Sequence, residues 1–382
     1  MTKAIKKTGS DSAVGIYVHI PFCVRKCLYC DFLSGPASGS RMADYLDALI
    51  REIDVCGEEG TKADTIFIGG GTPSLLEISL MDRIFEELHR KFRVSPEAEI
   101  TMEANPGTLS LEKLKAYRGM GINRLSIGLQ SADDGELKML GRIHSFEDFR
   151  RTWEMARDAG FENMNLDLIS GLPLQTEESW EKTLRTAALF RPEHISAYSL
   201  IVEDGTPFAE MDLSLPDEDT EYRMYDDTKE ILAEYGFHRY EISNYALPGC
   251  ESRHNSSYWT GKDYLGFGIG AASLRNGRRY TVTRDMERYL DPARKKEELL
   301  TDLCILTLED RMEEFMFLGL RMTCGTDKEE FRRRFACEMD DIYGEVIRRH
   351  KALGLLDEEG TRVFLTDRGI HVSNRVMADF LL

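Results

Sequence analysis

The cysteines of this 382-residue chain are the first residues whose spacing points to chemistry. Three of the eight, Cys23, Cys27 and Cys30, form a C-x3-C-x2-C stretch directly after an apolar segment. A zinc site usually takes four ligands from two knuckles, and no second knuckle lies nearby in the sequence. A disulfide would leave one thiol over, and a chance cluster of three buried thiols is rare. Iron–sulfur clusters normally take four thiolates, so the stretch favours a cluster with one iron open to another ligand.

Glycines and polar residues follow the apolar segments farther along the chain. The run Gly69–Pro73 (GGGTP) lets a backbone approach a ligand closely, although a plain tight turn would also explain it. Glu103 ends a later apolar segment, and Gln130 follows the next one. The carboxyl ends of parallel strands gather at one rim of a (β/α) barrel. We therefore expect these residues to lie together at such a rim.

The elements that must position these residues alternate in the first two-thirds of the chain. Six short apolar segments predict buried parallel strands: 15–20, 65–68, 99–103, 124–129, 164–169 and 195–200. Segments with helical apolar spacing lie between them. Successive β/α units predict an α/β fold with right-handed crossovers. A six-unit or partial (β/α)6 barrel fits better than an open Rossmann sheet, because no GxGxxG follows the first strand.

Changes in composition and in apolar spacing divide the chain into four predicted parts. A polar tail covers 1–14 and the partial barrel 15–245. A connecting region at 246–300 is rich in aromatic, glycine and turn-forming residues. The last part, 301–382, predicts helices, a short hairpin and a final helix, which together suggest a helical, winged-helix-like domain.

Composition limits the classes of function. With 42% hydrophobic and 30% charged residues, the chain resembles an ordinary soluble globular protein. Its net charge of −18 disfavours non-specific binding to nucleic acid and to anionic lipid. From Thr301 to the end there are 12 basic and 17 acidic residues, so the winged-helix-like part is not expected to read DNA. No stretch reaches the length of a membrane span, and the N-terminus lacks the apolar core of a secretory signal. We expect a cytoplasmic protein.

The segment YVHIPFCVRKCLYCDF resembles the opening signature of the radical S-adenosylmethionine (SAM) enzymes. More narrowly, YVHIPFC resembles the oxygen-independent coproporphyrinogen III oxidase-like branch, and the similarity extends through nearly the whole chain. The resemblance implies that Cys23, Cys27 and Cys30 bind a [4Fe–4S] cluster. SAM would chelate the fourth iron, and electron transfer would cleave it to a 5′-deoxyadenosyl radical.

The same resemblance assigns further residues to the cofactors. It implies that the loop of Gly70, Gly71 and Thr72 contacts the aminoacyl part of SAM. Positions matching other SAM contacts are Glu103, Gln130, Arg142 and Asp167, and positions flanking the cluster and adenine are Tyr17 and Tyr29. Taken singly, the polar residues would read as solvated or capping residues, and the tyrosines as core residues.

Two departures separate this chain from the oxidases of that branch. Phe32 stands where the oxidases have a fourth cysteine, and the N-terminal arm is short. The segment HNSSYW, from His254 to Trp259, instead resembles the HNxxYW hallmark of a sister group of heme chaperones. The resemblance implies heme contact at or near His254. A capped loop with an aromatic plug would also explain the motif, and His19 is expected to be structural.

The resulting expectation is a heme chaperone that binds heme and passes it to an apo-hemoprotein, such as a respiratory enzyme near the membrane. The cluster and SAM would support dimerisation or transfer. Two enzymatic alternatives stay open: oxidative decarboxylation of coproporphyrinogen III, and another radical modification of heme.

Overall fold

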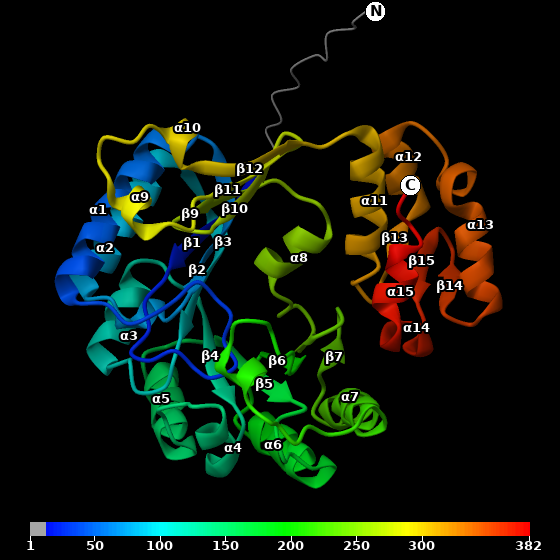
Figure 1. The fold of residues 1–382 in the computed structure, drawn as a ribbon, viewed down its shortest axis with the longest axis horizontal. Helices are drawn as coiled ribbons and strands as arrows, with labels where there is room; N and C mark the ends of the chain where they lie inside the picture. The colour runs from blue at the N-terminus through cyan, green and yellow to red at the C-terminus, as the bar shows by residue number, and fades with distance from the viewer. Residues whose placement is uncertain (1–12) are drawn as a thin grey trace, which may run out of the picture.

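The computed structural model describes residues 13–382, so nearly all of the predicted polar tail 1–14 lies outside the described residues. Six parallel strands stand in chain order at the centre of a 12-stranded sheet (Figure 1). They are β1 (Val14–Ile20), β2 (Lys62–Gly70), β3 (Arg93–Ala104), β4 (Arg124–Gln130), β5 (Asn163–Ser170) and β6 (His194–Ser199). The described sheet does not close into a barrel, and the predicted partial (β/α)6 fold is confirmed.

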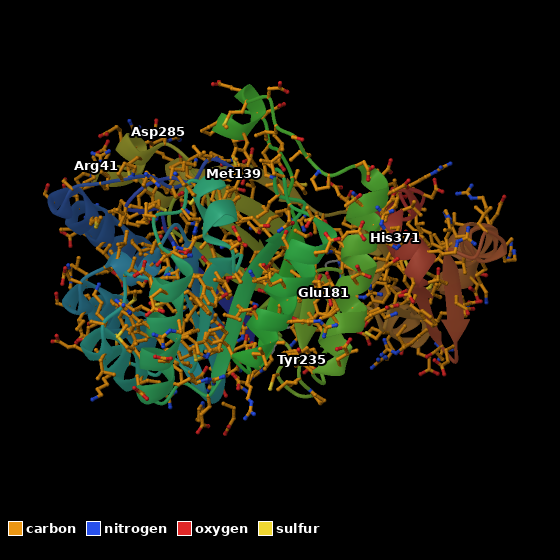
Figure 2. The ribbon with its side chains drawn as sticks, turned by 90° about the horizontal axis from the view of Figure 1, so that it is seen from below. Arg41, Met139, Glu181, Tyr235, Asp285 and His371 are labelled. Atoms are coloured by element: carbon orange, nitrogen blue, oxygen red, sulfur yellow. The ribbon has the colours of Figure 1, made fainter. Side chains whose placement is uncertain are left out.

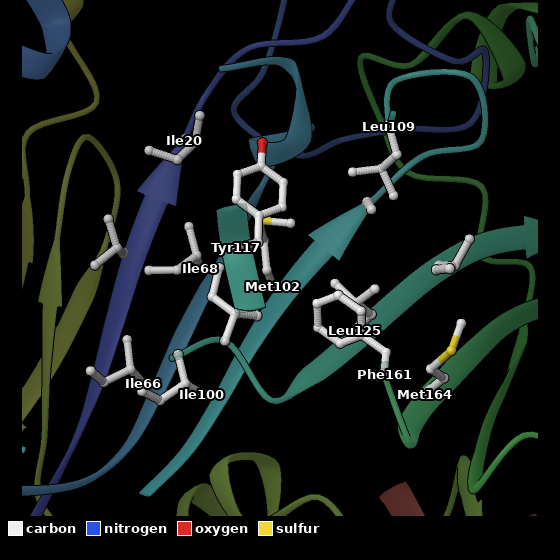
Figure 3. Packing of buried hydrophobic residues seen from close by; sticks show 14 of the residues in the cluster. Ile20, Ile66, Ile68, Ile100, Met102, Leu109, Tyr117, Leu125, Phe161 and Met164 are labelled. Carbon is white, nitrogen blue, oxygen red and sulfur yellow. The ribbon is translucent and has the colours of Figure 1, made fainter. Parts of the chain in front are cut away.

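Helices from the crossovers cover the outer face of these strands. They are α1 (Gly39–Cys56), α2 (Ile78–Lys91), α3 (Leu111–Gly119), α4 (Asp134–Met139), α5 (Phe146–Asp158), α6 (Glu177–Leu189) and α7 (Glu218–Glu234), with short 3-10 turns η1 (Pro73–Leu75) and η2 (Pro207–Glu210). These helices cover the strands because each has an apolar side to bury. In α2, the residues Met81, Ile84, Phe85 and Leu88 follow the helical period and are all buried. Figure 3 shows Tyr117 of α3 packed among strand side chains such as Ile68 and Met102.

Strand alternation gives the sheet two chemically different faces. On β5, Met164, Leu166 and Leu168 join the hydrophobic core under the helices. Asn165 and Asp167 alternate with these three residues along the strand. They therefore lie on the opposite face, where they line a cavity. Because side chains alternate along a strand, the same residues that build the core also fix a polar interior.

Further strands extend both edges of the sheet. Beyond β6 lies β8 (Asn244–Ala246), which is antiparallel to β6, and beyond it lies β7 (His238–Arg239), which is antiparallel to β8. Beyond β1 lie β9 (Tyr264–Phe267), parallel to it, and then β10 (Ala272–Arg275), β11 (Arg278–Val282) and β12 (Leu300–Ile305). Helices α9 (Met286–Leu290) and α10 (Lys296–Leu299) connect β11 to β12. Much of the predicted connecting region therefore belongs to the same sheet, and the proposed boundaries of that region stay predictions.

The glycines of the connecting region have a steric reason. A Cβ at Gly266 would lie 2.2 Å from the Ala272 carbonyl oxygen. Gly268 has φ +97°, and a Cβ there would lie 2.4 Å from the Tyr45 hydroxyl. Close backbone approach thus explains why this segment, which forms strands, lacks an ordinary strand pattern.

The C-terminal helices enclose a separate hydrophobic core. They are α11 (Leu308–Gly319), α12 (Lys328–Phe335), α13 (Met339–Ala352), α14 (Asp367–His371) and α15 (Ser373–Ala378), with a small sheet of β13 (Thr326–Asp327), β15 (Arg362–Leu365) and β14 (Leu356–Glu359). Met316, Phe331 and Tyr343 are among the side chains buried there. The predicted helical, winged-helix-like architecture is confirmed.

This C-terminal domain lies against α7 and the neighbouring edge of the sheet. Figure 2 shows His371 of α14 at this junction, where its Nε2 lies 2.9 Å from Oδ1 of Asp226 on α7. Asp367 accepts hydrogen bonds from Lys229 and from Arg239, each at 2.8 Å. Within residues 13–382, no helix has the length and apolar character needed to cross a bilayer.

One short helix links the two parts. Helix α8 (Arg253–Trp259) carries the HNSSYW segment and lies between the sheet and α11 (Figure 1). Ser252 caps its N-terminus by accepting from the Asn255 amide at 3.3 Å.

Candidate functional site

The three cysteines lie on the loop between β1 and α1, and all three line a cavity of about 390 Å³ at the carboxyl ends of the strands. Backbone hydrogen bonds hold the loop: the Cys23 amide donates to Gly35 and the Leu28 amide to Leu140, each at 3.0 Å. The Cys30 thiol is partly buried, and burial raises its pKa.

Two donors point at the thiols. The Thr72 hydroxyl lies 3.6 Å from Cys23 Sγ, and Nη1 of Arg142 lies 3.7 Å from Cys27 Sγ. Such donors stabilise thiolates, the form that binds metal. In the described part of the chain, no three His, Cys, Asp or Glu side chains are grouped tightly enough to hold one metal ion. Three thiols at one cavity are the type of ligand that iron–sulfur clusters take.

The glycine loop after β2 lies directly against the cysteine loop. Gly70 has φ +116°, and a Cβ there would lie 2.6 Å from the His19 ring. A Cβ at Gly71 would lie 2.6 Å from the Phe22 carbonyl oxygen and 3.0 Å from Cys23 Sγ. Only glycine fits both positions without displacement, and the bare backbone leaves room for a ligand beside the thiols.

Two half-buried carboxyls, Glu103 and Asp167, form the floor of the cavity. Glu103 accepts from the Gly70 amide at 3.0 Å, and Asp167 accepts from Ser126 at 3.0 Å and from Asn165 at 2.9 Å. Burial, reinforced by the charge of Asp167, raises the pKa of Glu103 to about 8. Burial also raises the pKa of Asp167. A cationic ligand in the cavity would favour the ionised form of both groups.

Arg142 and Gln130 complete the wall near β4. Nη2 of Arg142 donates to the Asn105 side chain at 2.6 Å and to the Gly128 carbonyl at 2.8 Å. Gln130 has φ 71° at a register shift between β4 and β5, and its side chain is buried. A left-handed non-glycine residue at a cavity wall is a strained conformation of the kind found at functional sites.

The structure brings most of the predicted cofactor residues to this cavity. Lining it are Cys23, Cys27, Cys30, Tyr29, Gly70, Gly71, Glu103, Gln130, Arg142 and Asp167. Thr72 lies behind the wall, where it accepts from the Asn105 side chain at 2.7 Å. Tyr17 and His254 line a second, deeper cavity of about 230 Å³. Their roles, and those of the other residues, in binding a cofactor stay predictions.

Asn105, Ser126 and Tyr198 are among the lining residues that the sequence did not predict. A signal was present for each, because Asn105 and Ser126 stand at even spacing from Glu103 and Gln130, and Tyr198 lies one residue before the end of the sixth strand. Residues two apart on a strand share a face. Ser126 and Tyr198, like Glu103 and Asp167, border both cavities.

His254 lies in the protein interior, with 1% of its surface exposed. Its Nδ1 lies 2.8 Å from the Thr65 hydroxyl and its Nε2 2.8 Å from the Tyr258 hydroxyl. Burial lowers its pKa to about 3, so the imidazole is neutral. Both ring nitrogens are hydrogen-bonded in this conformation, and heme contact by His254 stays a prediction.

Comparisons with known proteins agree with this architecture. A model described as the Radical SAM superfamily matches residues 17–187, and one described as the HemN C-terminal domain matches 306–372. The solved structure of coproporphyrinogen III oxidase (HemN) from Escherichia coli aligns with a TM-score of 0.84 at 25% identity, covering 97% of this chain and 90% of that one.

Curated relatives are similar over most of their length. The heme chaperone HemW of Bacillus subtilis is 38% identical over 96% of this chain and 98% of its own. The heme chaperone HemW of Escherichia coli is 39% identical over 74% of this chain and 79% of its own. With the radical SAM fold, the cysteine loop and this extent of similarity together, the chain belongs to the HemW family of radical SAM proteins.

Proposed function

We propose that this protein is a heme chaperone, which binds heme and transfers it to an apo-hemoprotein. The observation that carries the proposal is the apolar lip of the cysteine-lined cavity, formed by Phe32 and Ile201. Their exposed fractions are 64% and 67%. Exposed side chains of this size at a cavity mouth suit a flat apolar macrocycle. Similarity to the HemW proteins supports the same function.

Phe32 also supports this proposal over oxidase chemistry. It occupies the position at which the similar oxidases carry a fourth cysteine, and it lines the cavity while remaining 64% exposed. An apolar ring there offers packing area to a bound porphyrin and offers no thiol to a reaction.

The cofactor set follows from the residues at the cavity. Cys23, Cys27 and Cys30 would each bind one iron of a [4Fe–4S] cluster, which supplies single electrons at low potential when bound. Gly70, Gly71, Glu103, Gln130, Arg142 and Asp167 would hold SAM, with Thr72, Tyr17 and Tyr29 flanking these groups. The carboxyls of Glu103 and Asp167 favour the cationic ammonium and sulfonium groups of SAM, and the buried wall excludes water from them.

Heme titration of two matched variants tests the proposal. Phe32→Asp places a charge where the macrocycle would pack and is expected to weaken heme binding about tenfold or more. Val55→Asp is the control, because Val55 lies in the last turn of α1, outside the cavity lining, and has the same exposed fraction of 64%. Equal heme affinity in the two variants, measured by Soret absorption, would remove heme from this mouth.

The second candidate function is oxygen-independent coproporphyrinogen III oxidation. The match to HemN over 97% of the chain favours it. Anaerobic turnover of coproporphyrinogen III by the reconstituted protein would establish it, whereas heme bound without consumption supports the chaperone.

The remaining partners are part of the same proposal. We propose a cytoplasmic protein that forms a homodimer and meets a respiratory hemoprotein near the membrane. Light scattering of the reconstituted protein with and without SAM tests the dimer. A monomer under both conditions would contradict it.

A further inference from the structure

The HNSSYW helix is packed into the barrel by its histidine. The His254 ring stacks on Phe67 of β2, with centroids 5.2 Å apart and planes at 28°, and the Tyr258 ring meets it edge-on at 5.1 Å. Thr65 and Tyr258 hydrogen-bond its two nitrogens. A Cβ at Gly15 would lie 3.4 Å from the imidazole. These contacts hold the ring against β1, β2 and Tyr258, although it also borders the second cavity, so a shift of His254 toward these neighbours must displace them.

Ring contacts and hydrogen bonds link the neighbours of His254 to the cysteine loop. Phe67 stacks on Tyr17, with centroids 6.2 Å apart. The Tyr17 hydroxyl lies 2.9 Å from Nδ1 of His19, and Nε2 of His19 lies 2.9 Å from the Leu33 carbonyl oxygen. Leu33 follows Cys30 by three residues.

The direction of these last two hydrogen bonds is determined by chemistry. A carbonyl oxygen only accepts, so Nε2 of His19 carries the proton and donates to Leu33. The buried ring is neutral, because burial lowers its pKa. Nδ1 therefore accepts, and the Tyr17 hydroxyl is the donor. Removing that single hydroxyl would break the link without removing a ring.

The other end of α8 contacts the C-terminal domain. The Arg321 guanidinium lies over the Trp259 ring, 4.3 Å from its centroid. Nη1 of Arg334 donates to the Thr260 carbonyl at 3.1 Å. Arg321 follows α11 directly, and Arg334 is on α12. Helix α8 thus contacts the domain through Trp259 and the barrel interior through His254.

We propose that His254 is a positioning residue for the cysteine loop and that α8 couples this loop to the C-terminal domain. The proposal rests on the cluster and SAM site of the proposed function. The Arg321–Trp259 contact and the contacts from His254 through Phe67, Tyr17 and His19 to Leu33 carry it, and α8 joins the two because it holds both Trp259 and His254. In this conformation His254 acts on the cofactor site from behind and leaves the mouth free for heme.

Two variants break the contacts at different places. His254→Ala removes the ring on which Phe67 stacks, and Tyr17→Phe removes only the hydroxyl that holds His19. Each is expected to weaken SAM binding about tenfold and to change the electron paramagnetic resonance spectrum of the reduced cluster with SAM. Ser256→Ala, on the same helix but outside these contacts, is the control and should match the wild type.

A second pair of variants tests the contact between α8 and the C-terminal domain. Arg321→Met keeps an unbranched apolar stem but loses the cation over Trp259, and a roughly threefold loss of SAM affinity is expected. Arg333→Met is the control, because Arg333 lies on the same domain with its side chain 72% exposed. Equal SAM affinities for Arg321→Met and Arg333→Met would overturn the coupling.

Heme titration of His254→Ala separates this proposal from direct heme ligation. Unchanged heme affinity together with weakened SAM binding is the expected result. Loss of heme binding with unchanged SAM affinity and an unchanged cluster spectrum would overturn the proposal. If His254→Ala does not fold, the SAM affinity and cluster spectrum of Tyr17→Phe decide whether these contacts position the cysteine loop. If the wild type binds no heme, the chaperone function fails, while the SAM and spectral measurements still decide the role of His254.

Discussion

The half-buried carboxyls Glu103 and Asp167 give the cysteine-lined cavity its electrostatic character. No lysine or arginine forms an ion pair with either of them within the described residues, and hydroxyl, amide and backbone donors hold them instead. Ionisation of both carboxyls is unfavourable without a nearby cation, because their negative charges repel each other. A bound cation would favour the ionised form of both. The cavity is thereby prepared for a cationic ligand such as SAM.

The raised pKa of Glu103 predicts a pH dependence of stability. Folding raises this pKa from an ordinary 4.5 to about 8, so between these values the folded protein binds more protons than the unfolded chain. The free energy of unfolding of the apo protein should therefore fall as pH rises from about 4.5 to 8. Glu103→Gln should flatten that part of the curve, measured by chemical denaturation at several pH values. An unchanged slope would show that Glu103 titrates normally.

The cysteines carry a prediction of their own. Cys27→Ser should abolish the visible charge-transfer absorption of the reconstituted protein, because each cluster iron needs its thiolate. Cys304→Ser, at an exposed cysteine on β12, is the control and should keep the full spectrum. Full absorption in Cys27→Ser would contradict the site.

Much of the barrel could be predicted from the sequence, because its strands are apolar and its helices follow a regular period. Helix α8 could not, since its seven residues are mostly polar and aromatic and show no apolar stripe. Its Ser252 cap and the glycine at 261 were the available signals. Strand β9 was missed because Gly266, which close packing requires, interrupts its strand pattern.

The cofactor site was predictable where a residue belongs to a short local motif. Residues brought together by strand alternation across several strands, such as Ser126 and Tyr198, needed the register of the sheet. The depth of His254 could not be read from its motif either, because burial depends on where α8 enters the open barrel.

Helix α8 depends on Glu99 for its place. The buried Glu99 carboxylate accepts from the amides of Arg253 at 3.0 Å and His254 at 2.9 Å. Glu99→Ala would leave two buried donors unpaired and should lower the free energy of unfolding by roughly 2–4 kcal/mol. Glu97→Ala, at an exposed position on the same strand, should cost less than about 0.5 kcal/mol. Equal denaturation midpoints would show that Glu99 does not hold α8.

In the whole molecule, the C-terminal domain is fixed to the barrel by polar contacts as well as by α8. Asp367 joins Lys229 and Arg239, and the Arg239 side chain is only 6% exposed. Hydrogen bonding by Lys229 lowers the pKa of Asp367, so this contribution to stability is present at neutral pH and is lost as pH falls below about 4.

Asp367→Asn should therefore lower stability by roughly 1–2 kcal/mol at pH 7, because it leaves a buried guanidinium without its counter-charge. The exposure of Asp367 itself, 63%, keeps the effect small. Glu359→Gln, at an exposed carboxylate of the same domain, is the control. Denaturation of both variants at pH 7 and pH 3 checks the size of the loss and its disappearance in acid.

The central claim is that this cofactor site serves heme binding rather than porphyrinogen oxidation. The most direct test incubates the reconstituted protein anaerobically with SAM, a reductant and coproporphyrinogen III, beside a sample given heme alone. A heme chaperone should form no protoporphyrinogen and should hold intact, protein-bound heme in the second sample. Multiple turnovers of coproporphyrinogen III would contradict it and make the protein an oxidase.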